Sequence, residues 1–213
     1  MIEWNESNFD VTAHPYTKQN YELKRYAFVS DYVRLKALND FGGLYLDTDV
    51  EIKKKFDDSF LDYGMFLPFM YDCTLSTAVI GAEPGHEAIK KLLDQYRDLE
   101  IKDSPNNGLF TRFFLQEFEN FRLNNRFQVL NGTIAVFPKE YFECPTFSRD
   151  MGYSVHHFTG SWKVKDDRKF RNIIKWLAKS VIGDVLYSKM QRYRALRISP
   201  FYDTYLEHKH GVS

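Results

Sequence analysis

The feature that most constrains this chain of 213 residues is a short apolar segment, residues 44–46, followed at once by Asp47 and Asp49. Two glycines precede the segment, and they end a helix that apolar spacing predicts over residues 21–40. A brief apolar run between such boundaries is typical of a buried strand. The two carboxylates therefore fall at the carboxyl end of this strand.

The rest of the pattern alternates in the same way. Residues 77–80 and 134–137 are apolar runs of strand length. Between them, apolar residues keep helical spacing over residues 88–96 and again over residues 110–118. Because strands and helices alternate and the length suits one domain, we predict a single α/β domain.

Charge divides the chain into two parts. The 29 basic and 29 acidic residues cancel, which argues against a nucleic-acid-binding protein. Residues 1–162 hold 17 basic and 24 acidic residues, whereas residues 163–213 hold 12 and 5. We predict that this last part is a basic helical extension, which suits either a solvated helical cap or contact with an anionic membrane surface.

The sequence gives few signs of export. Its first residues lack the basic and apolar segments of a signal peptide, and no stretch approaches the roughly 20 apolar residues of a membrane span. Cys73 and Cys144 do not form a disulfide framework or a Cys-x-x-Cys motif, and we expect both to be reduced. We therefore expect a cytoplasmic protein, or one peripheral to the inner face of the membrane.

Asp47 and Asp49 are suited to binding a metal ion. Two acidic residues separated by one position project to the same side of an extended chain, so both can face one divalent cation. A cation held in this way, Mn²⁺ or Mg²⁺, can neutralise the charge that develops on a departing diphosphate. Asp-x-Asp alone is common in turns, so the surrounding residues have to support this interpretation.

Those surroundings are Ser30-Asp31-x-x-Arg34, then Gly42-Gly43, then Tyr45 and the aspartates. This order resembles the Asp-x-Asp sugar-binding region of glycosyltransferase family 32, which includes capsular-polysaccharide enzymes. The resemblance implies a GT-A-like, Rossmann-type domain with a mixed, mainly parallel sheet. It also implies a metal-dependent hexosyltransferase that retains anomeric configuration, with Ser30, Asp31, Arg34 and Tyr45 at the donor. As an i, i+3 pair, Asp31 and Arg34 could otherwise be a plain surface salt bridge.

A second cluster, residues 155–162, resembles the His-His-x-x-Gly-Ser-Trp segment of bacterial family members. By that similarity we predict His157 as a third metal ligand and expect Ser161 and Trp162 to close over the donor. His156, whose side chain should point the opposite way on a strand, is interpreted as structural.

Asn107 and Gly108 begin a helix in a region that lies near the donor in the family, and we predict donor contacts for both. The resemblance implies a nucleoside diphosphate sugar as donor, UDP-sugar more than GDP-sugar. It implies a saccharide or lipid-linked saccharide as acceptor, in surface or capsular polysaccharide synthesis.

The resemblance covers residues 1–162, which we predict as the catalytic domain, with residues 163–213 as the extension. Family members usually begin with a further strand that contributes to the nucleotide pocket, and this sequence starts after it. A catalytically impaired sugar-nucleotide-binding module therefore remains an alternative. A haloacid-dehalogenase-type phosphatase also places Asp-x-Asp after a strand, but its motif needs Thr or Val where this sequence has Glu51.

Overall fold

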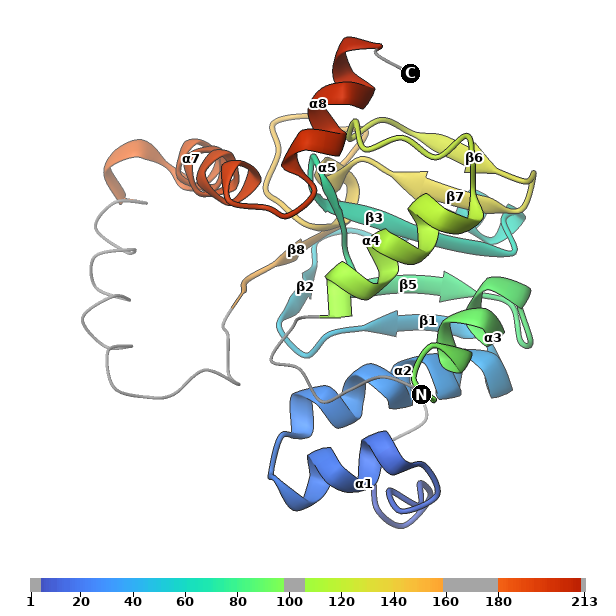
Figure 1. Cartoon of the computed structure of the whole chain (residues 1–213). Coiled ribbons are helices and arrows are strands. Elements are labelled where there is room, and N and C mark those ends of the chain that lie inside the picture. The colour runs from blue at the N-terminus through green and yellow to red at the C-terminus, as the bar shows by residue number, and fades with distance from the viewer. Residues whose placement is uncertain (1–4, 98–105, 159–179, 212–213) are drawn as a thin grey trace.

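The computed structural model describes residues 5–97, 106–158 and 180–211 (Figure 1). Strands lie in the middle of the molecule and helices pack around them, so the predicted α/β class is confirmed. The helices are α1 (Pro15–Glu22), α2 (Tyr26–Phe41), the 3-10 helix η1 (Asp58–Asp62), α3 (Glu87–Asp94), α4 (Asn106–Glu117), α5 (Lys139–Phe142), α7 (Asp184–Arg197) and α8 (Tyr202–His210).

The described strands form two sheets. They are β1 (Gly43–Leu46), β2 (Val50–Ile52), β3 (Met65–Tyr71), β4 (Thr74–Leu75), β5 (Val79–Ala82), β6 (Gln128–Leu130), β7 (Ile134–Phe137) and β8 (Ser154–His156). The main sheet has the order β1-β5-β3-β7-β6, with β4 paired to β3, and a small second sheet joins β2 to β8. A mixed sheet covered by helices is consistent with the expected GT-A-like domain.

The direction of the strands differs in part from the expectation of a mainly parallel sheet. Strands β3 and β7 are parallel, whereas the other pairings within the described residues are antiparallel. Connection length accounts for β7, because a short connection can only join antiparallel neighbours and a parallel pair needs a long crossover. The chain passes through α3 and α4 between β3 and β7, but only a tight turn separates β6 from β7.

The helix predicted over residues 21–40 is two helices in the structure. Lys24 has a φ of +57°, which interrupts the helical backbone between α1 and α2. Gly42 ends α2 with a φ of +63°, and a Cβ at this position would lie 2.6 Å from Cδ of Pro84. Glycine is therefore required here both by the backbone conformation and by the close approach of the next segment.

The core has one cluster of apolar residues on each side of the main sheet. Alternation along β3 sends Met65, Leu67 and Phe69 to the larger cluster, under α3, α4 and α8. Phe66 points to the smaller cluster, which is rich in aromatic rings: Phe60, Phe137, Phe142 and Tyr153. Burial on both faces fixes the sheet, and with it the residues that follow β1 and those that precede β5.

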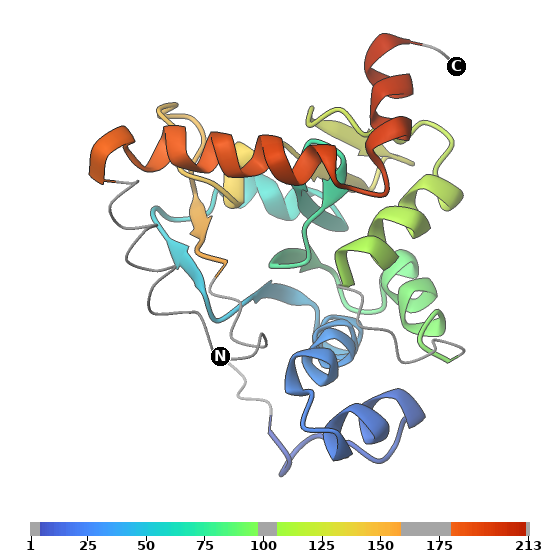
Figure 2. The same cartoon turned by 60° about the vertical axis from the view of Figure 1, so that its left-hand side comes forward.

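The predicted C-terminal helices are present as α7 and α8. Figures 1 and 2 show them above the main sheet, with the C-terminus at the outer end of α8. Leu196, Phe201 and Tyr205 from this region belong to the larger core cluster. No helix within the described residues is long and apolar enough to cross a membrane.

Candidate metal and donor site

The side chains of the two predicted aspartates and of one histidine meet where β1 ends and the small sheet begins. Asp47 and Asp49 follow β1, and β2 then pairs with β8 so that Val50 lies opposite His156. This register places Nε2 of His156 3.2 Å from Oδ1 of Asp49. Asp47, Asp49 and His156 each offer one ligand atom, and these atoms lie within 4.8 Å of one another.

The donor set fits a divalent cation. Two carboxylates supply the hard oxygen ligands that Mg²⁺ and Mn²⁺ prefer, and one imidazole nitrogen suits Mn²⁺ better than Ca²⁺. All three side chains are partly buried rather than fully exposed. Acidic groups at a surface often have no ion, but an imidazole aimed at a pair of carboxylates is a more specific arrangement.

Within the described residues, the histidine that groups with the two aspartates is His156 and not the predicted His157. Nε2 of His157 lies 2.9 Å from Oε2 of Glu51, and its side chain is 45% exposed. Neighbouring residues point to opposite sides at a strand end, so only one histidine can face the aspartates. The register of β8 against β2 decides which one, and that register was not readable from the motif.

Arg34 joins the predicted donor residues to the first aspartate. Its side chain is only 5% exposed, and its Nη2 lies 2.7 Å from Oδ1 of Asp31. Its Nη1 donates to the carbonyl oxygen of Thr77 at 2.7 Å and lies 3.3 Å from Oδ1 of Asp47. The pair Asp31–Arg34 is therefore a buried link in the site and not a solvated surface pair.

The ionisation of these residues follows from their burial and proximity. Burial favours the neutral form of Arg34, but Asp31, Tyr45 and Asp47 outweigh it and raise the pKa of Arg34. Burial raises the pKa of Asp31 to about 6, with Arg34 acting against this shift and Asp47 adding to it. Arg34 thus stays charged and holds two carboxylates together.

Tyr45 and Ser30 make different contacts. The Tyr45 hydroxyl donates to Oδ1 of Asp47 at 2.7 Å, and the guanidinium carbon of Arg34 lies 4.7 Å from the centre of the tyrosine ring. The Ser30 hydroxyl instead donates to the carbonyl oxygen of Ala27 in the preceding helical turn, at 2.8 Å. Tyr45 therefore holds the Asp47 carboxylate of the candidate metal site, while Ser30 satisfies the helix backbone.

The remaining predicted donor residues are less directly connected. The Asn107 amide donates to the carbonyl oxygen of Leu75 at 2.9 Å, which docks the start of α4 on β4. Gly108 lies in the first turn of the same helix. Ser161 and Trp162 lie outside the described residues.

Sequence motifs did not identify the segment that contacts both Arg34 and Asp47. Residues 76–78 join β4 to β5, and all three are nearly inaccessible to solvent. The carbonyl oxygen of Thr77 accepts from Arg34, and that of Ala78 accepts from the Asp47 amide at 2.8 Å. These contacts are made by backbone atoms, so side-chain identity carries no signal for them.

The structure also places Glu143 directly behind His156. Oε2 of Glu143 lies 3.0 Å from Nδ1 of His156, and the Glu143 side chain is 1% exposed. Burial lowers the pKa of His156, but the hydrogen bond and charge of Glu143 and the charge of Asp49 outweigh burial and raise it. An acidic residue beside Phe142 and Cys144 in an apolar run was the sequence signal that could have identified Glu143.

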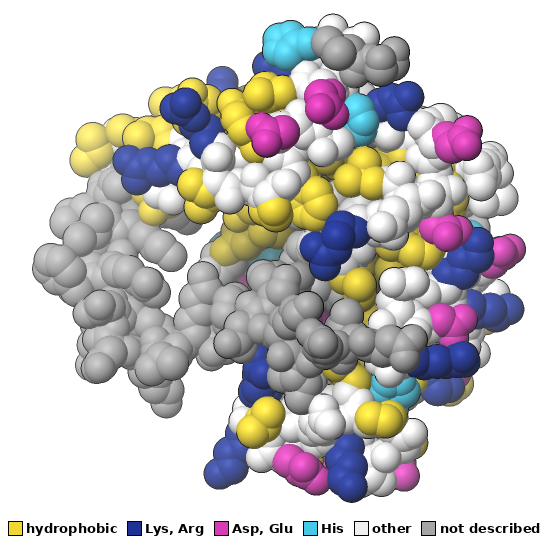
Figure 3. All heavy atoms as spheres, in the orientation of Figure 1, with side chains coloured by type: hydrophobic (Ala, Val, Ile, Leu, Met, Phe, Trp, Pro, Cys, Tyr) yellow, Lys and Arg dark blue, Asp and Glu magenta, His cyan; other side chains and the backbone are white. Residues whose placement is uncertain are grey.

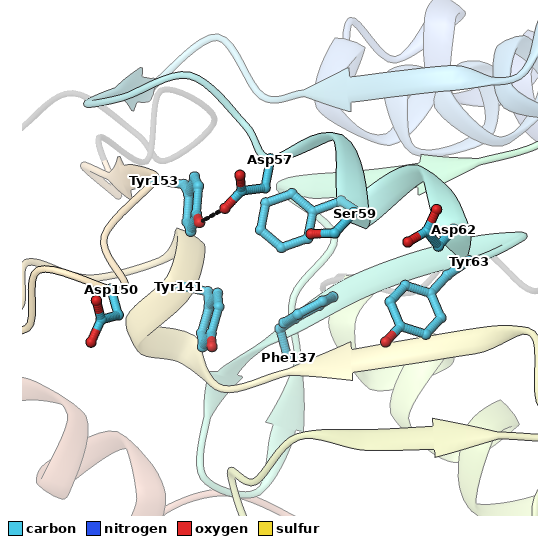
Figure 4. A pocket seen from close by; sticks show the side chains of 9 residues that line it. Asp57, Ser59, Asp62, Tyr63, Phe137, Tyr141, Asp150 and Tyr153 are labelled. Atoms are coloured by element: carbon cyan, nitrogen blue, oxygen red, sulfur yellow. Dashed lines mark hydrogen bonds between the residues drawn. The ribbon is translucent and has the colours of Figure 1, made fainter.

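A separate hollow of about 320 Å³ lies beyond the other end of β8 (Figure 4). Tyr141 and Tyr153 stand side by side along it, and the Tyr153 hydroxyl donates to Asp57. Asp47, Asp49 and His156 are not among the residues that line it. The hollow is therefore distinct from the candidate metal site.

Comparison with known proteins agrees with the part of the site that lies within residues 1–66. Residues 1–66 match the family model described as the glycosyltransferase sugar-binding region containing DXD motif. This match includes Asp31, Arg34 and both aspartates, and it supports glycosyltransferase activity for the chain. No curated protein and no solved structure matches the chain significantly.

Proposed function

We propose that this protein transfers a hexose from a nucleoside diphosphate sugar to a saccharide hydroxyl, using Mn²⁺ or Mg²⁺ held by Asp47, Asp49 and His156. One observation carries the proposal. Ligand atoms from these three residues converge within 4.8 Å, and the two aspartates belong to the region that matches the sugar-binding family model. His156 comes from outside that region and completes the group.

When bound, the cation would supply positive charge to the diphosphate as it leaves the sugar. The protein's own contribution is to hold the acidic ligands in place before substrate arrives. Arg34 fixes Asp47 from one side, and the Tyr45 hydroxyl donates to the same carboxylate oxygen. Such preorganisation avoids rearrangement during the reaction.

Asp31 is suited to the sugar. A carboxylate accepts hydrogen bonds from sugar hydroxyls, and Arg34 binds one of the Asp31 oxygens and so orients the group. The Asp31 side chain is 14% exposed, so part of it can still reach a ligand. We therefore assign Asp31 to sugar recognition and Arg34 to holding Asp31 and Asp47 in register.

Further details of the proposal follow the resemblance to family 32. We propose retention of anomeric configuration, a UDP-sugar as donor, and a role in surface or capsular polysaccharide synthesis with a saccharide or lipid-linked acceptor. Analysis of the product anomer by NMR tests retention, and a panel of UDP- and GDP-sugars tests the base.

A lipid-linked acceptor would agree with the outer face of α7, where hydrophobic and basic side chains lie together (Figure 3). Leu186, Met190 and Tyr193 are more than half exposed on this helix. Helical spacing places Lys189 and Arg194 on either side of this stripe. An apolar stripe flanked by basic residues suits contact with an anionic membrane surface, which we propose for this helix.

The main test is manganese-dependent hydrolysis of a panel of sugar nucleotides. We expect Asp49→Ala to reduce turnover by at least about 100-fold, because charge stabilisation by a metal is worth several kcal/mol. Asp58→Ala, at a side chain that is 85% exposed, is the matched control. Undiminished turnover in Asp49→Ala contradicts the proposal. Donor binding in calorimetry without hydrolysis or transfer would point instead to a binding module.

A further inference from the structure

Glu143 is a buried carboxylate that the proposed reaction does not use. It follows α5 as the helix cap, and its side chain is 1% exposed. Its two oxygens have separate partners: Oε2 lies 3.0 Å from Nδ1 of His156, and Oε1 accepts from the Ser76 hydroxyl at 2.6 Å. A buried acidic group with two directional partners is a fixed element of the structure.

Ser76 is itself held in place. It is 0% exposed, its amide donates to the carbonyl oxygen of Pro68 at 2.8 Å, and its hydroxyl oxygen accepts from the Ala78 amide at 3.1 Å. The orientation of the Glu143 carboxylate is therefore determined by the main sheet. The main chain adds a further link, because the His156 amide donates to the carbonyl oxygen of Glu143 at 3.3 Å.

The flat face of the His156 ring is fixed as well. The Phe158 ring stacks on it with centroids 4.0 Å apart and planes inclined by 28°. Phe158 has a φ of +49°, a conformation that is rare for a bulky residue. With its Nδ1 edge against Glu143 and one face against Phe158, the ring directs Nε2 toward Asp49.

We propose that Glu143 is a positioning residue that keeps the Nδ1 proton of His156, so that the Nε2 lone pair faces Asp47 and Asp49 and is available to a divalent cation. This inference rests on the proposed function, because it assumes that the three residues bind a cation. A neutral imidazole has one nitrogen that donates and one that accepts, and the partner of the first nitrogen selects the second as ligand. Carboxylates behind metal-binding histidines act in this way in other metal sites.

Metal affinity without any sugar nucleotide tests the proposal. Titration of Mn²⁺ into Glu143→Leu, followed by electron paramagnetic resonance of free Mn²⁺, should show binding about 10–100-fold weaker than in the unmodified protein. Ser154→Ala is the matched control, because its hydroxyl donates to the carbonyl oxygen of Phe142 at 2.7 Å and so links the same segments. We expect unchanged Mn²⁺ affinity in the control.

A second measurement separates positioning from general support. Proton–nitrogen correlation spectra of the metal-free protein, taken at a pH where the His156 ring is neutral, should show the proton on Nδ1. In Glu143→Leu the proton should move to Nε2, because Asp49 at 3.2 Å is then the nearest carboxylate. A folded Glu143→Leu variant with unchanged Mn²⁺ affinity, or with the proton still on Nδ1, overturns the proposal.

Two milder variants apply if Glu143→Leu does not fold. Glu143→Gln keeps an acceptor for His156 but loses the charge, and Ser76→Ala removes the hydroxyl that orients Glu143. Each should weaken Mn²⁺ binding several-fold, and unchanged affinity in both rejects the inference. Asp49→Ala separates the two levels of the argument. If it too binds Mn²⁺ normally, the proposed metal site is wrong; if it alone loses Mn²⁺, only the role of Glu143 is wrong.

Discussion

The candidate site has two sides that are built in different ways. The arginine side consists of Asp31, Arg34, Tyr45 and Asp47, which come from α2, from β1 and from the residue directly after β1. The histidine side consists of Asp49, Ser76, Glu143 and His156, in which Ser76 and Glu143 are 67 positions apart. The first side is formed by neighbours in the sequence, whereas the second joins distant segments, and the pairing of β8 with β2 brings His156 to Asp49.

The two sides also differ in what their charges do. On the arginine side the buried guanidinium of Arg34 is bound to Asp31 and lies close to Asp47, so these charges stabilise one another inside the protein. On the histidine side the imidazole of His156 lies between Asp49 and Glu143. Its Nε2 is the nitrogen that can bind a metal ion. We infer that the arginine side serves mainly to keep the site in shape and the histidine side mainly to determine metal affinity. The following variants test this division.

Arg34→Met should have the largest effect on folding. It leaves Asp31 and Asp47 without their buried cation, and breaking such a pair costs about 3–5 kcal/mol. Urea unfolding monitored by circular dichroism measures the change. Lys36→Met on the same helix is the control, because the Lys36 side chain is 40% exposed and its pair with Asp40 is worth about 0.5 kcal/mol. Equal losses in both variants would remove the special role of the arginine side.

His156→Ala and His157→Ala should separate the adjacent histidines. Loss of His156 removes a metal ligand and should weaken Mn²⁺ binding by at least about 100-fold. This is the upper end of the range for loss of a residue that only supports a ligand. His157 bonds to Glu51 and is 45% exposed, so its loss should leave Mn²⁺ affinity nearly unchanged. Calorimetric titration with Mn²⁺ measures both. The reverse result would restore His157 as the ligand.

Metal binding should weaken in acid because of His156. Its pKa is raised in the folded protein, so protons compete with the cation for Nε2 below that value. Mn²⁺ affinity should fall by about tenfold per pH unit in this range for one competing proton. Titrations between about pH 8.5 and about pH 5.5 measure the slope, which should be shallower in His156→Ala. Equal slopes in the two proteins would exclude His156 as the titrating group.

The free energy of unfolding of the metal-free protein should show the opposite dependence on pH. A histidine whose folded pKa lies above its ordinary value of 6.5 stabilises the fold fully below that value. This contribution is lost as the pH rises through the folded pKa. Urea unfolding of the metal-free protein should therefore show the His156 contribution decreasing on the alkaline side, whereas metal binding improves there.

Tyr45→Phe should have the smallest effect of the set. It removes one hydrogen bond to the Asp47 carboxylate and leaves the ring beside Arg34 in place. We expect a loss of about 1 kcal/mol in the free energy of unfolding. Tyr26→Phe, on a ring that is 57% exposed, is the matched control. No difference between the two variants would show that the Tyr45 hydroxyl adds nothing to the arginine side.

Local sequence patterns predicted the helix and the strand that carry the arginine side. Helical spacing puts Asp31 and Arg34 one turn apart, and the glycine pair ends the helix so that the next residues form a strand. These features depend on backbone geometry over a few residues, so a motif is enough to recognise them. The boundary at residue 21 was wrong because a single positive φ at Lys24 divides the helix.

The histidine side could not be read in the same way. A motif near residues 155–162 indicated a metal-binding histidine, but a shift of one residue in a strand exchanges the two faces. The pairing of Val50 with His156 sets that register. Glu143 follows the short helix α5 in a segment with no ligand motif, and only packing behind β8 brings it to the imidazole.

The sequence by itself therefore determined the α/β class, the acidic pair at the end of β1, and the helix that carries Asp31 and Arg34. These follow from periodicity and from the conformational freedom of glycine, which act over short distances along the chain. The tertiary structure alone decided which histidine faces the aspartates, which carboxylate supports it, and that Arg34 is buried between two acids. Those outcomes depend on strand register and on burial, which arise only when distant segments pack together.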